Sequence, residues 1–325
     1  MNLTLKKTKW NGDPAADRDK FIGGSDIGTI LGMNPWKSAY TLWAEKSGLI
    51  EAPDISDKEA EWWGNYDEEG VAKRFCEKTG KKVKRSLMSY GIEEIPYLRG
   101  HIDRLIVGEK AGLECKTTSS FNKTDFDNGQ IPPAHYAQCQ FYMLVTGFER
   151  WYYAVKRDNR EFFIQEVDRS DGFIETMIDR MAAFWECVQS NNPPAVDGSE
   201  STTGTLARLY GSENAKDEQF TTDLGNDVAE ALSEAEKRKE MIKALKAEET
   251  KYENIAREAM GEFQTAYAGD YRASWKVQNR SGGVDIKKLQ KEFPNAYAQC
   301  RKPDTSVRIF TFKKLEERKD NPNND

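Results

Sequence analysis

The sequence contains little histidine and little cysteine, with 2 His and 5 Cys among 325 residues. With only His101 and His135 present, a histidine-rich metal site is excluded. The cysteines are scattered and form no C-x-x-C pair, which argues against a zinc site, an iron–sulfur cluster or a disulfide framework. Reduced thiols of a cytosolic protein explain them better. Any metal must then be held mainly by carboxylates, which suit hard cations such as Mg²⁺ or Mn²⁺.

Long apolar runs are also missing. No segment approaches the ~20 apolar residues of a membrane helix, and the polar, basic segment Met1–Trp10 lacks the apolar region of a signal peptide. We therefore expect a soluble, cytoplasmic protein without membrane partners. The formal net charge of -6 disfavours non-specific nucleic-acid binding. It leaves room for a local basic groove that engages phosphates.

Hydrophobic periodicity predicts an α+β domain over residues 1–195. Amphipathic helices are expected at 59–79, 134–146 and 172–189, and strands at 82–90, 97–107, 112–118, 150–156 and 161–167. Gly80 is a plausible C′ residue that ends the first of these helices. The order of elements favours a mixed central β-sheet flanked by helices.

The last third of the chain has a different composition. Residues 196–222 are rich in Ser, Thr, Gly and Asp and are interpreted as a linker. Apolar residues then recur every three or four positions over 223–264, which predicts one long heptad-patterned helix in a coiled coil or helical hairpin. Residues 265–315 suggest a small α/β unit, with strands at 271–277 and 307–312 around a helix at 285–293. The charged tail 316–325 is expected to be disordered.

Three charged residues in the predicted hairpin could carry chemistry. Asp103 lies on one predicted strand, and Glu114 and Lys116 share a face of the next, with Cys115 on the opposite face. Two adjacent carboxylates repel unless a cation lies between them. A Mg²⁺ ion held by Asp103, Glu114 and the carbonyl of Cys115 would provide a Lewis acid and a nucleophile for phosphodiester hydrolysis, with Lys116 orienting or deprotonating water or offsetting phosphate charge. The competing interpretation is an ordinary cross-strand ion pair on a solvated face.

A series of short motifs across residues 17–195 resembles the YqaJ-type viral recombinase family, the phage lambda exonuclease branch of the PD-(D/E)XK nucleases. The motifs, in chain order, are Arg18, Ile22–Ile27, Leu31–Gly32, Pro35–Ser38, Trp63–Gly64 with Glu68, the Asp103 strand, Glu114–Lys116, Ile131–Pro133, Tyr136–Gln138 with Tyr142, Gly147, Trp151–Tyr152 and Phe184–Trp185. Their order and spacing carry the resemblance more than any single motif does.

The resemblance implies a role for each matching residue. Asp103 and Glu114 would be metal ligands and Lys116 the catalytic lysine, with Glu68 supporting the metal from across the cleft. Gln138 would lie beside the reacting phosphate. Arg18 and Ser25 would bind phosphate, in this family a 5′-terminal one, and Lys37 and Tyr142 would complete the set that binds DNA phosphates.

The Gly23–Ser25 turn before a predicted helix would also offer backbone N–H groups to an anion. Asp26 at this turn either belongs to the site or simply caps the helix.

The sequence departs from the family pattern at two positions. Arg104 stands where the family usually has glycine, and Asp67 where it usually has an apolar residue. Which acid of Asp67, Glu68 and Glu69 faces the metal is therefore open, with Glu68 favoured by the family.

Three further residue types are weighed against simpler roles. For Trp62 and Trp63 a core or interface role is favoured over base stacking. His135 is expected at the surface, and Cys115 as a small buried hydrophobe.

The resulting expectation is a 5′→3′ exonuclease acting on double-stranded DNA ends in phage-type recombination, from a phage or prophage in a bacterial host. The alternatives are an endonuclease of the same fold, or a catalytically silent module that binds DNA ends or protein. Arg18, Lys37, Lys116 and Lys123 could line one basic channel. The resemblance further implies a homo-oligomer, with a trimer favoured, and the long helix could recruit a single-strand annealing protein.

Overall fold

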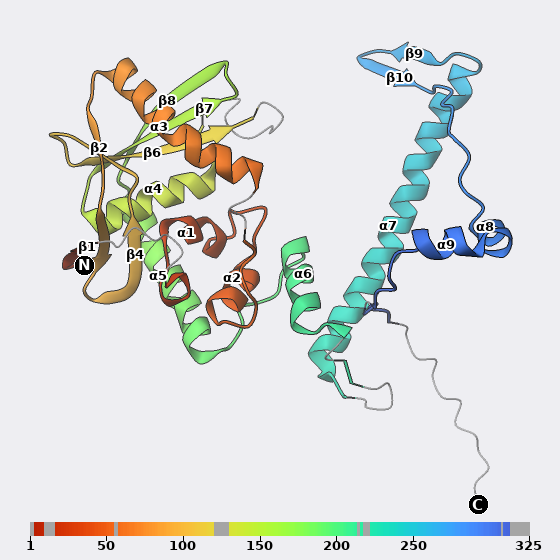
Figure 1. Ribbon diagram of the computed structural model, residues 1–325, viewed down its shortest axis with the longest axis horizontal. Helices are drawn as coiled ribbons and strands as arrows, with labels where there is room; N and C mark the ends of the chain where they lie inside the picture. Colours follow the sequence, from red (N-terminus) through yellow and green to blue (C-terminus); the bar gives the residue numbers. More distant parts are fainter. Residues whose placement is uncertain are drawn as a thin grey trace, which may run out of the picture. The chain divides into compact units, whose positions relative to one another are not determined.

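The chain divides into two compact units, Met1–Gly211 and Ser212–Asp325, each described by itself below (Figure 1). The computed structural model describes residues 3–9, 17–54, 58–119, 130–212, 215–216, 222–306 and 308–312. Lys123 and the tail 316–325 lie outside the described residues. Within the described ranges, no helix is both long and apolar enough to cross a membrane.

A five-stranded mixed sheet forms the centre of the first unit. Its strands lie in the order β2 (Val83–Arg85), β5 (Arg104–Ile106), β6 (Ala111–Thr118), β7 (Arg150–Arg157) and β8 (Glu161–Asp168). β6 and β7 are parallel and the other neighbours antiparallel. The predicted α+β fold with a mixed sheet is thereby confirmed. A smaller antiparallel sheet contains β1 (Leu5–Lys9), β3 (Met88–Ile92) and β4 (Ile95–His101).

Helices cover both faces of the central sheet, as Figure 1 shows for α3 and α4. On one face α3 (Glu59–Thr79) packs Val71 and Phe75 against Leu113 and Cys115 of β6, and ends at Gly80 with φ 71° as predicted. On the other face lies α4 (Pro133–Thr146), which contacts α1 (Gly24–Ile30) and α5 (Asp171–Ser190). Because side chains alternate along a strand, Glu114, which lies between Leu113 and Cys115, faces away from α3.

The predicted strands 82–90 and 97–107 are each divided between the two sheets. β4 pairs with β3 up to His101, and the next strand, β5, pairs with β6 from Arg104 onward. Asp103 therefore lies in the break between β4 and β5 and not on a hairpin strand, which corrects the prediction. Since the apolar residues Leu98, Ile102 and Ile106 keep the even spacing of one continuous strand, the sequence pattern could not reveal the change of partner.

The predicted linker 196–222 contains helix α6 (Glu200–Leu209), which packs on α2 (Ala39–Lys46). The Thr41 hydroxyl lies 2.7 Å from that of Ser201 and 2.8 Å from that of Thr205, and Thr202 donates to Ser38 at 2.9 Å. The first unit thus extends to Gly211. Ser- and Thr-rich composition suggested a linker, yet here the hydroxyls pair with one another between two helices.

The second unit is built on α7 (Gly225–Met260), the single long helix that the heptad pattern predicts. A hairpin of β9 (Thr265–Ala268) and β10 (Tyr271–Ser274) follows, and then α8 (Ile286–Glu292) and α9 (Pro294–Cys300). The strand expected at 271–277 is thus shorter, and residues 308–312 form no strand. Most apolar side chains of α7 are exposed, and its partner in a coiled coil stays a prediction.

Candidate active site

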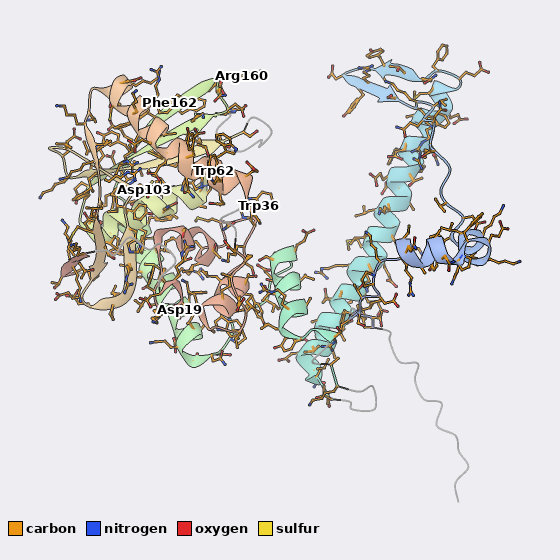
Figure 2. The ribbon with its side chains drawn as sticks, in the orientation of Figure 1. Asp19, Trp36, Trp62, Asp103, Arg160 and Phe162 are labelled. Atoms are coloured by element: carbon orange, nitrogen blue, oxygen red, sulfur yellow. The ribbon has the colours of Figure 1, made fainter. Side chains whose placement is uncertain are left out.

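A cleft of about 710 Å³ in the first unit gathers the predicted site residues. It is lined by nine of the ten: Arg18, Ser25, Glu68, Asp103, Glu114, Cys115, Lys116, Gln138 and Tyr142. The exception is Lys37, which lies in a separate pocket and is ion-paired with Glu45. In Figure 2, Asp103 lies among the strands, while Trp36 and Trp62 lie near the N-terminal end of α3.

Glu114 is the most deeply buried acid of the cleft, with 1% of its surface exposed. One carboxylate oxygen, Oε1, receives an ion pair from Lys116 Nζ at 2.6 Å. The other, Oε2, is buried without a hydrogen-bond partner among the described residues. An unsatisfied buried carboxylate oxygen is costly unless a cation or donor meets it. The Glu114–Lys116 pair is thus not the solvated ion pair of the simpler interpretation.

The protonation of Asp103 and Lys116 follows from this crowding. Burial, followed by the charges of Glu114 and Glu68, raises the pKa of Asp103 to about 8. For Lys116 burial lowers the pKa, but the charge and hydrogen bond of Glu114 outweigh it and the pKa is raised. Lys116 is therefore an ammonium ion, and Asp103 and Glu114 share a site that favours an added positive charge.

Arg104 is a site residue that sequence reasoning missed. Its side chain is buried, and Nη1 contacts Glu68 Oε1 at 2.6 Å and the Asp103 carbonyl at 3.0 Å, while Nη2 contacts Glu69 Oε2 at 2.9 Å. Asp67 instead pairs with Lys156 at 2.6 Å. Of the three consecutive acids, Glu68 is the one that lines the cleft. The available signal was the combination of an unusual arginine with a run of three acids.

The donor chemistry of the cleft suits a hard divalent cation. Asp103 and Glu114 offer carboxylate oxygens, and Glu114 Oε2 has no partner among the described residues. Among those same residues, no three His, Cys, Asp or Glu side chains are gathered closely enough to form a ready-made metal cage. The ion pairs explain this, because Arg104 holds Glu68 and Lys116 holds Glu114. Asp103 and Glu114 therefore fit the ion better as a pair than together with Glu68.

The opposite wall of the cleft carries the residues expected to bind phosphate. Arg18, in the short 3-10 helix η1 (Arg18–Lys20), donates to Ser25 Oγ at 3.4 Å. Gln138 Nε2 donates to the Tyr142 hydroxyl at 2.9 Å. At Gly24 a Cβ would lie 2.7 Å from the Tyr142 ring, so only glycine lets α1 approach α4 this closely.

Asp26 caps α1, because its Oδ2 accepts from the Gly23 N–H at 2.9 Å and from Lys46 at 2.9 Å. The predicted capping role is thus confirmed, and Asp26 also lines the cleft. The Gly23 N–H is consequently occupied and not offered to an anion. Anion binding at this turn would then depend on Arg18, the Ser25 hydroxyl and the N–H groups after Gly23.

Two further expectations are corrected by the structure. His135 lines it and is not a surface residue; its Nδ1 lies 2.6 Å from the Tyr153 hydroxyl, and burial together with Lys116 lowers its pKa to about 3. Trp62 and Trp63, which do not line the cleft, are each 50% exposed, so the core half of their expected role is wrong and an interface role stays a prediction. Cys115 is a buried, small side chain whose thiol pKa is raised by burial, as expected.

Comparison with known proteins gives the following similarities. Residues 15–149 match the YqaJ-like viral recombinase domain. The chain is 34% identical over 320 residues to the uncharacterized protein YqaJ of Bacillus subtilis strain 168, covering 97% of this chain and 96% of that protein.

Two solved structures are also similar. The alkaline exonuclease LHK-Exo from Laribacter hongkongensis has a TM-score of 0.47 at 18% identity, covering 59% of this chain and 96% of the other. A phage related exonuclease from Haemophilus somnus 129PT has a TM-score of 0.43 at 14% identity, covering 53% and 94%.

Proposed function

Because the chain belongs to the family of YqaJ-like viral recombinases, we propose that it is a metal-dependent deoxyribonuclease with a PD-(D/E)XK core. The observation that carries the proposal is the cleft, where Asp103, Glu114 and Lys116 adjoin Arg18 and Gln138. Glu114 Oε2, which has no hydrogen-bond partner within the described part of the chain, adds weight, since a buried carboxylate oxygen needs a counter-charge.

In the proposed site Asp103 and Glu114 hold Mg²⁺ or Mn²⁺, with the Cys115 carbonyl as a further donor. When bound, such an ion supplies Lewis-acid stabilisation and lowers the pKa of its water. Lys116 is held by Glu114 as an ammonium ion. It therefore offsets the charge that develops on the phosphate, and does not take a proton from water while this pair persists.

Arg104 is proposed as the residue that positions Glu68. It fills the space between Glu68, Glu69 and the Asp103 carbonyl with a fixed cation. Glu68 then contributes to the site through this ion pair and supports the metal from the side of α3.

The substrate is proposed to be the 5′ end of double-stranded DNA, cut in the 5′→3′ direction during phage-type recombination. Arg18 and Ser25, in contact on one wall of the cleft, would bind the terminal phosphate, and Gln138 would contact the phosphate to be cleaved. We further propose that the enzyme works as a homo-oligomer, with a trimer favoured. Its α7 would recruit a single-strand annealing protein or order the oligomer.

The decisive experiment compares linear duplexes carrying 5′-phosphate or 5′-hydroxyl ends with a covalently closed circle, in Mg²⁺ and in EDTA. We expect degradation of the 5′-phosphorylated linear duplex in Mg²⁺ alone. Asp103→Ala should abolish cleavage while leaving DNA binding intact, and Arg18→Ala should reduce the preference for phosphorylated ends. Cleavage of the closed circle would show an endonuclease, and activity in EDTA or complete inactivity would refute the proposal.

A further inference from the structure

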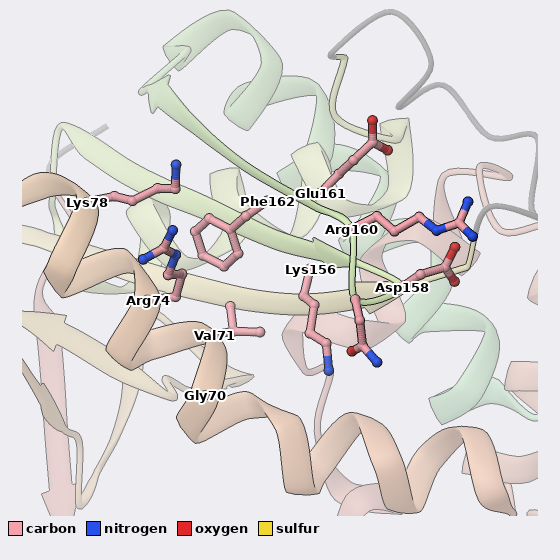
Figure 3. A pocket seen from close by; sticks show the side chains of 10 residues that line it. Gly70, Val71, Arg74, Lys78, Lys156, Asp158, Arg160, Glu161 and Phe162 are labelled. Carbon is pink, nitrogen blue, oxygen red and sulfur yellow. The ribbon is translucent and has the colours of Figure 1, made fainter.

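A second pocket, of about 370 Å³, lies on the α3 side of the sheet and is lined by cations (Figure 3). Arg74 and Lys78, one helical turn apart on α3, reach toward Phe162 of β8, and Lys156 of β7 extends toward the same helix. Arg160, in the turn between β7 and β8, lines the pocket as well. Four cations and two carboxylates line this pocket in a chain whose net charge is -6.

Some of this positive charge is available to a ligand. Lys156 pairs with Asp67 at 2.6 Å, and Arg74 pairs with Glu77 at 3.0 Å in a half-exposed ion pair that contributes little. For Lys78 and Arg160, the described part of the chain supplies no ion-pair partner within 4.0 Å. Among the described residues, Lys78 therefore lies near Phe162 without an ion-pair partner, and Arg160 lines the pocket farther from the ring without one (Figure 3).

The pocket adjoins the catalytic cleft through two elements. On α3, Glu68 lines the cleft and Gly70, two residues later, lines the pocket. Across the sheet, Thr117 lines the cleft while its β7 register partner Lys156 lines the pocket. A strand that leaves the cleft along α3 would reach the pocket within a short distance.

We propose that this pocket binds a nucleotide unit of single-stranded DNA, with its phosphates on Arg74, Lys78 and Arg160 and its base against Phe162. Cations together with an aromatic face are the elements by which proteins bind single strands, and the half-buried ring of Phe162 offers such a face. The volume is near the lower end of the range for small-molecule sites, which suits one nucleotide. The inference rests on the proposed function, because that activity supplies the single strand.

The test measures binding of a fluorescent thymidine dodecamer in EDTA to the full-length protein. The double variant Arg74→Gln/Lys78→Gln should weaken binding roughly tenfold and flatten the dependence of log K on log salt by about 1.4, the value for two phosphate contacts on a single strand. The matched control Lys9→Gln/Lys110→Gln removes two exposed cations elsewhere on the unit and should bind like the unmodified protein. Equal weakening by both pairs would overturn the proposal.

The stacking part has its own test. Phe162→Leu keeps an apolar side chain and should weaken binding of the dodecamer roughly tenfold, while leaving an abasic dodecamer unaffected. Phe162→Tyr, which retains an aromatic face, should restore binding and shows that any loss is not due to unfolding. An equal loss for the abasic strand would indicate a simple polyanion site and overturn the proposal. If thymidine monophosphate competes as strongly as the dodecamer does, the pocket binds a free nucleotide and not a DNA strand, and the proposal is overturned.

These measurements are separable from the proposed nuclease activity. If the unmodified protein binds the dodecamer in EDTA as proposed but never hydrolyses DNA in Mg²⁺, the proposed function fails and the pocket stands as a binding site. If hydrolysis occurs and the pocket variants bind like the control, only the present inference fails.

Discussion

The two units of this chain differ in what they bury: the first buries charged side chains, and the second exposes apolar ones. In the first unit Glu114 and Arg104 are 1% and 3% exposed, whereas on α7 of the second unit the apolar Ile242 and Leu245 are 59% and 58% exposed. Burying ions costs free energy unless they are paired, and exposing apolar surface costs free energy unless something covers it. The first unit therefore has the features of a site that acts on a ligand, and the second those of a surface that needs a partner.

This difference teaches where each kind of function can reside. A reactive carboxylate needs a rigid, dry surrounding, which only a unit with its own core provides. The first unit has such a core, formed by helices on both faces of a mixed sheet. Among the described residues of the second unit, Met260 is the one hydrophobic residue that is buried.

The largest effect is expected from Glu114→Gln in the first unit. Neutralising this buried acid removes both the partner of Lys116 and one proposed metal ligand, so cleavage should fall by about 1,000-fold or more. The matched variant Glu240→Gln on exposed α7 should cleave at the unmodified rate. Initial rates on a 5′-phosphorylated duplex measure both, and equal losses would show that chemistry is not confined to the first unit.

A second comparison removes one arginine from each unit. Arg104→Gln leaves Glu68 without its buried partner and should lower the free energy of unfolding by about 3 kcal/mol. Arg257→Gln breaks the pair with Glu253, 2.6 Å long and exposed on α7, and should change stability by less than about 0.5 kcal/mol. Urea unfolding followed by tryptophan fluorescence reports both units, since Trp275 lies in the second and the other tryptophans in the first, and similar midpoints for the two variants would contradict the buried role of Arg104.

The proposed metal site should respond to pH. Because the pKa of Asp103 is raised to about 8, a folded molecule holds a proton that the unfolded chain releases near pH 4. Stability of the metal-free protein should therefore fall as pH rises between these values. Mg²⁺ competes with this proton, so its affinity should drop roughly tenfold from about pH 8.5 to about pH 7.

Calorimetric Mg²⁺ titrations at both pH values, with thermal unfolding alongside, check this expectation. Asp103→Asn has no carboxyl group to titrate, so neither its stability nor its Mg²⁺ affinity should show this dependence on pH. A Mg²⁺ affinity independent of pH in the unmodified protein would contradict the assignment of Asp103 as a ligand.

The smallest effect on the first unit is expected from changes on α7. Ile242→Lys/Leu245→Lys disrupts its exposed apolar surface and should leave the rate of cleavage within about twofold, since surface changes rarely propagate. Oligomer mass by light scattering should fall if this surface joins copies of the chain. The isosteric control Ile242→Leu should keep the mass of the unmodified protein, and an unchanged mass in the double lysine variant would exclude the surface from assembly.

The helices and the site were predictable to different degrees. Periodicity predicted α3, α4, α5 and α7 because each has a local pattern of side chains that repeats along its own axis. The cleft was predictable through motifs spread over many residues, which is why Arg18, Gln138 and Tyr142 were identified together with Asp103. These residues were identified by the order and spacing of the family motifs and not by the chemistry of any one residue.

The misses share a physical cause. Lys37 has the right charge for a phosphate site, but its position on the chain turns it toward Glu45. His135 looked like a surface residue because nothing nearby in sequence reveals that Tyr153, from β7, meets it. Helix α6 was assigned to a linker because it is rich in Ser and Thr. Its hydroxyls find their partners on α2, more than 150 residues earlier in the chain, where no local pattern reveals them.

By itself the sequence determined the α+β class and the long helix, since these depend on local spacing, and the family resemblance of its motifs made Asp103, Glu114 and Lys116 the candidate site residues. Only the tertiary structure decided that Asp103 lies at a break between two sheets, that Glu68 lines the cleft, and that Arg104 is buried against it. Ion pairs and strand partners join residues far apart in the chain. Their choice depends on burial, which no local pattern of residues encodes.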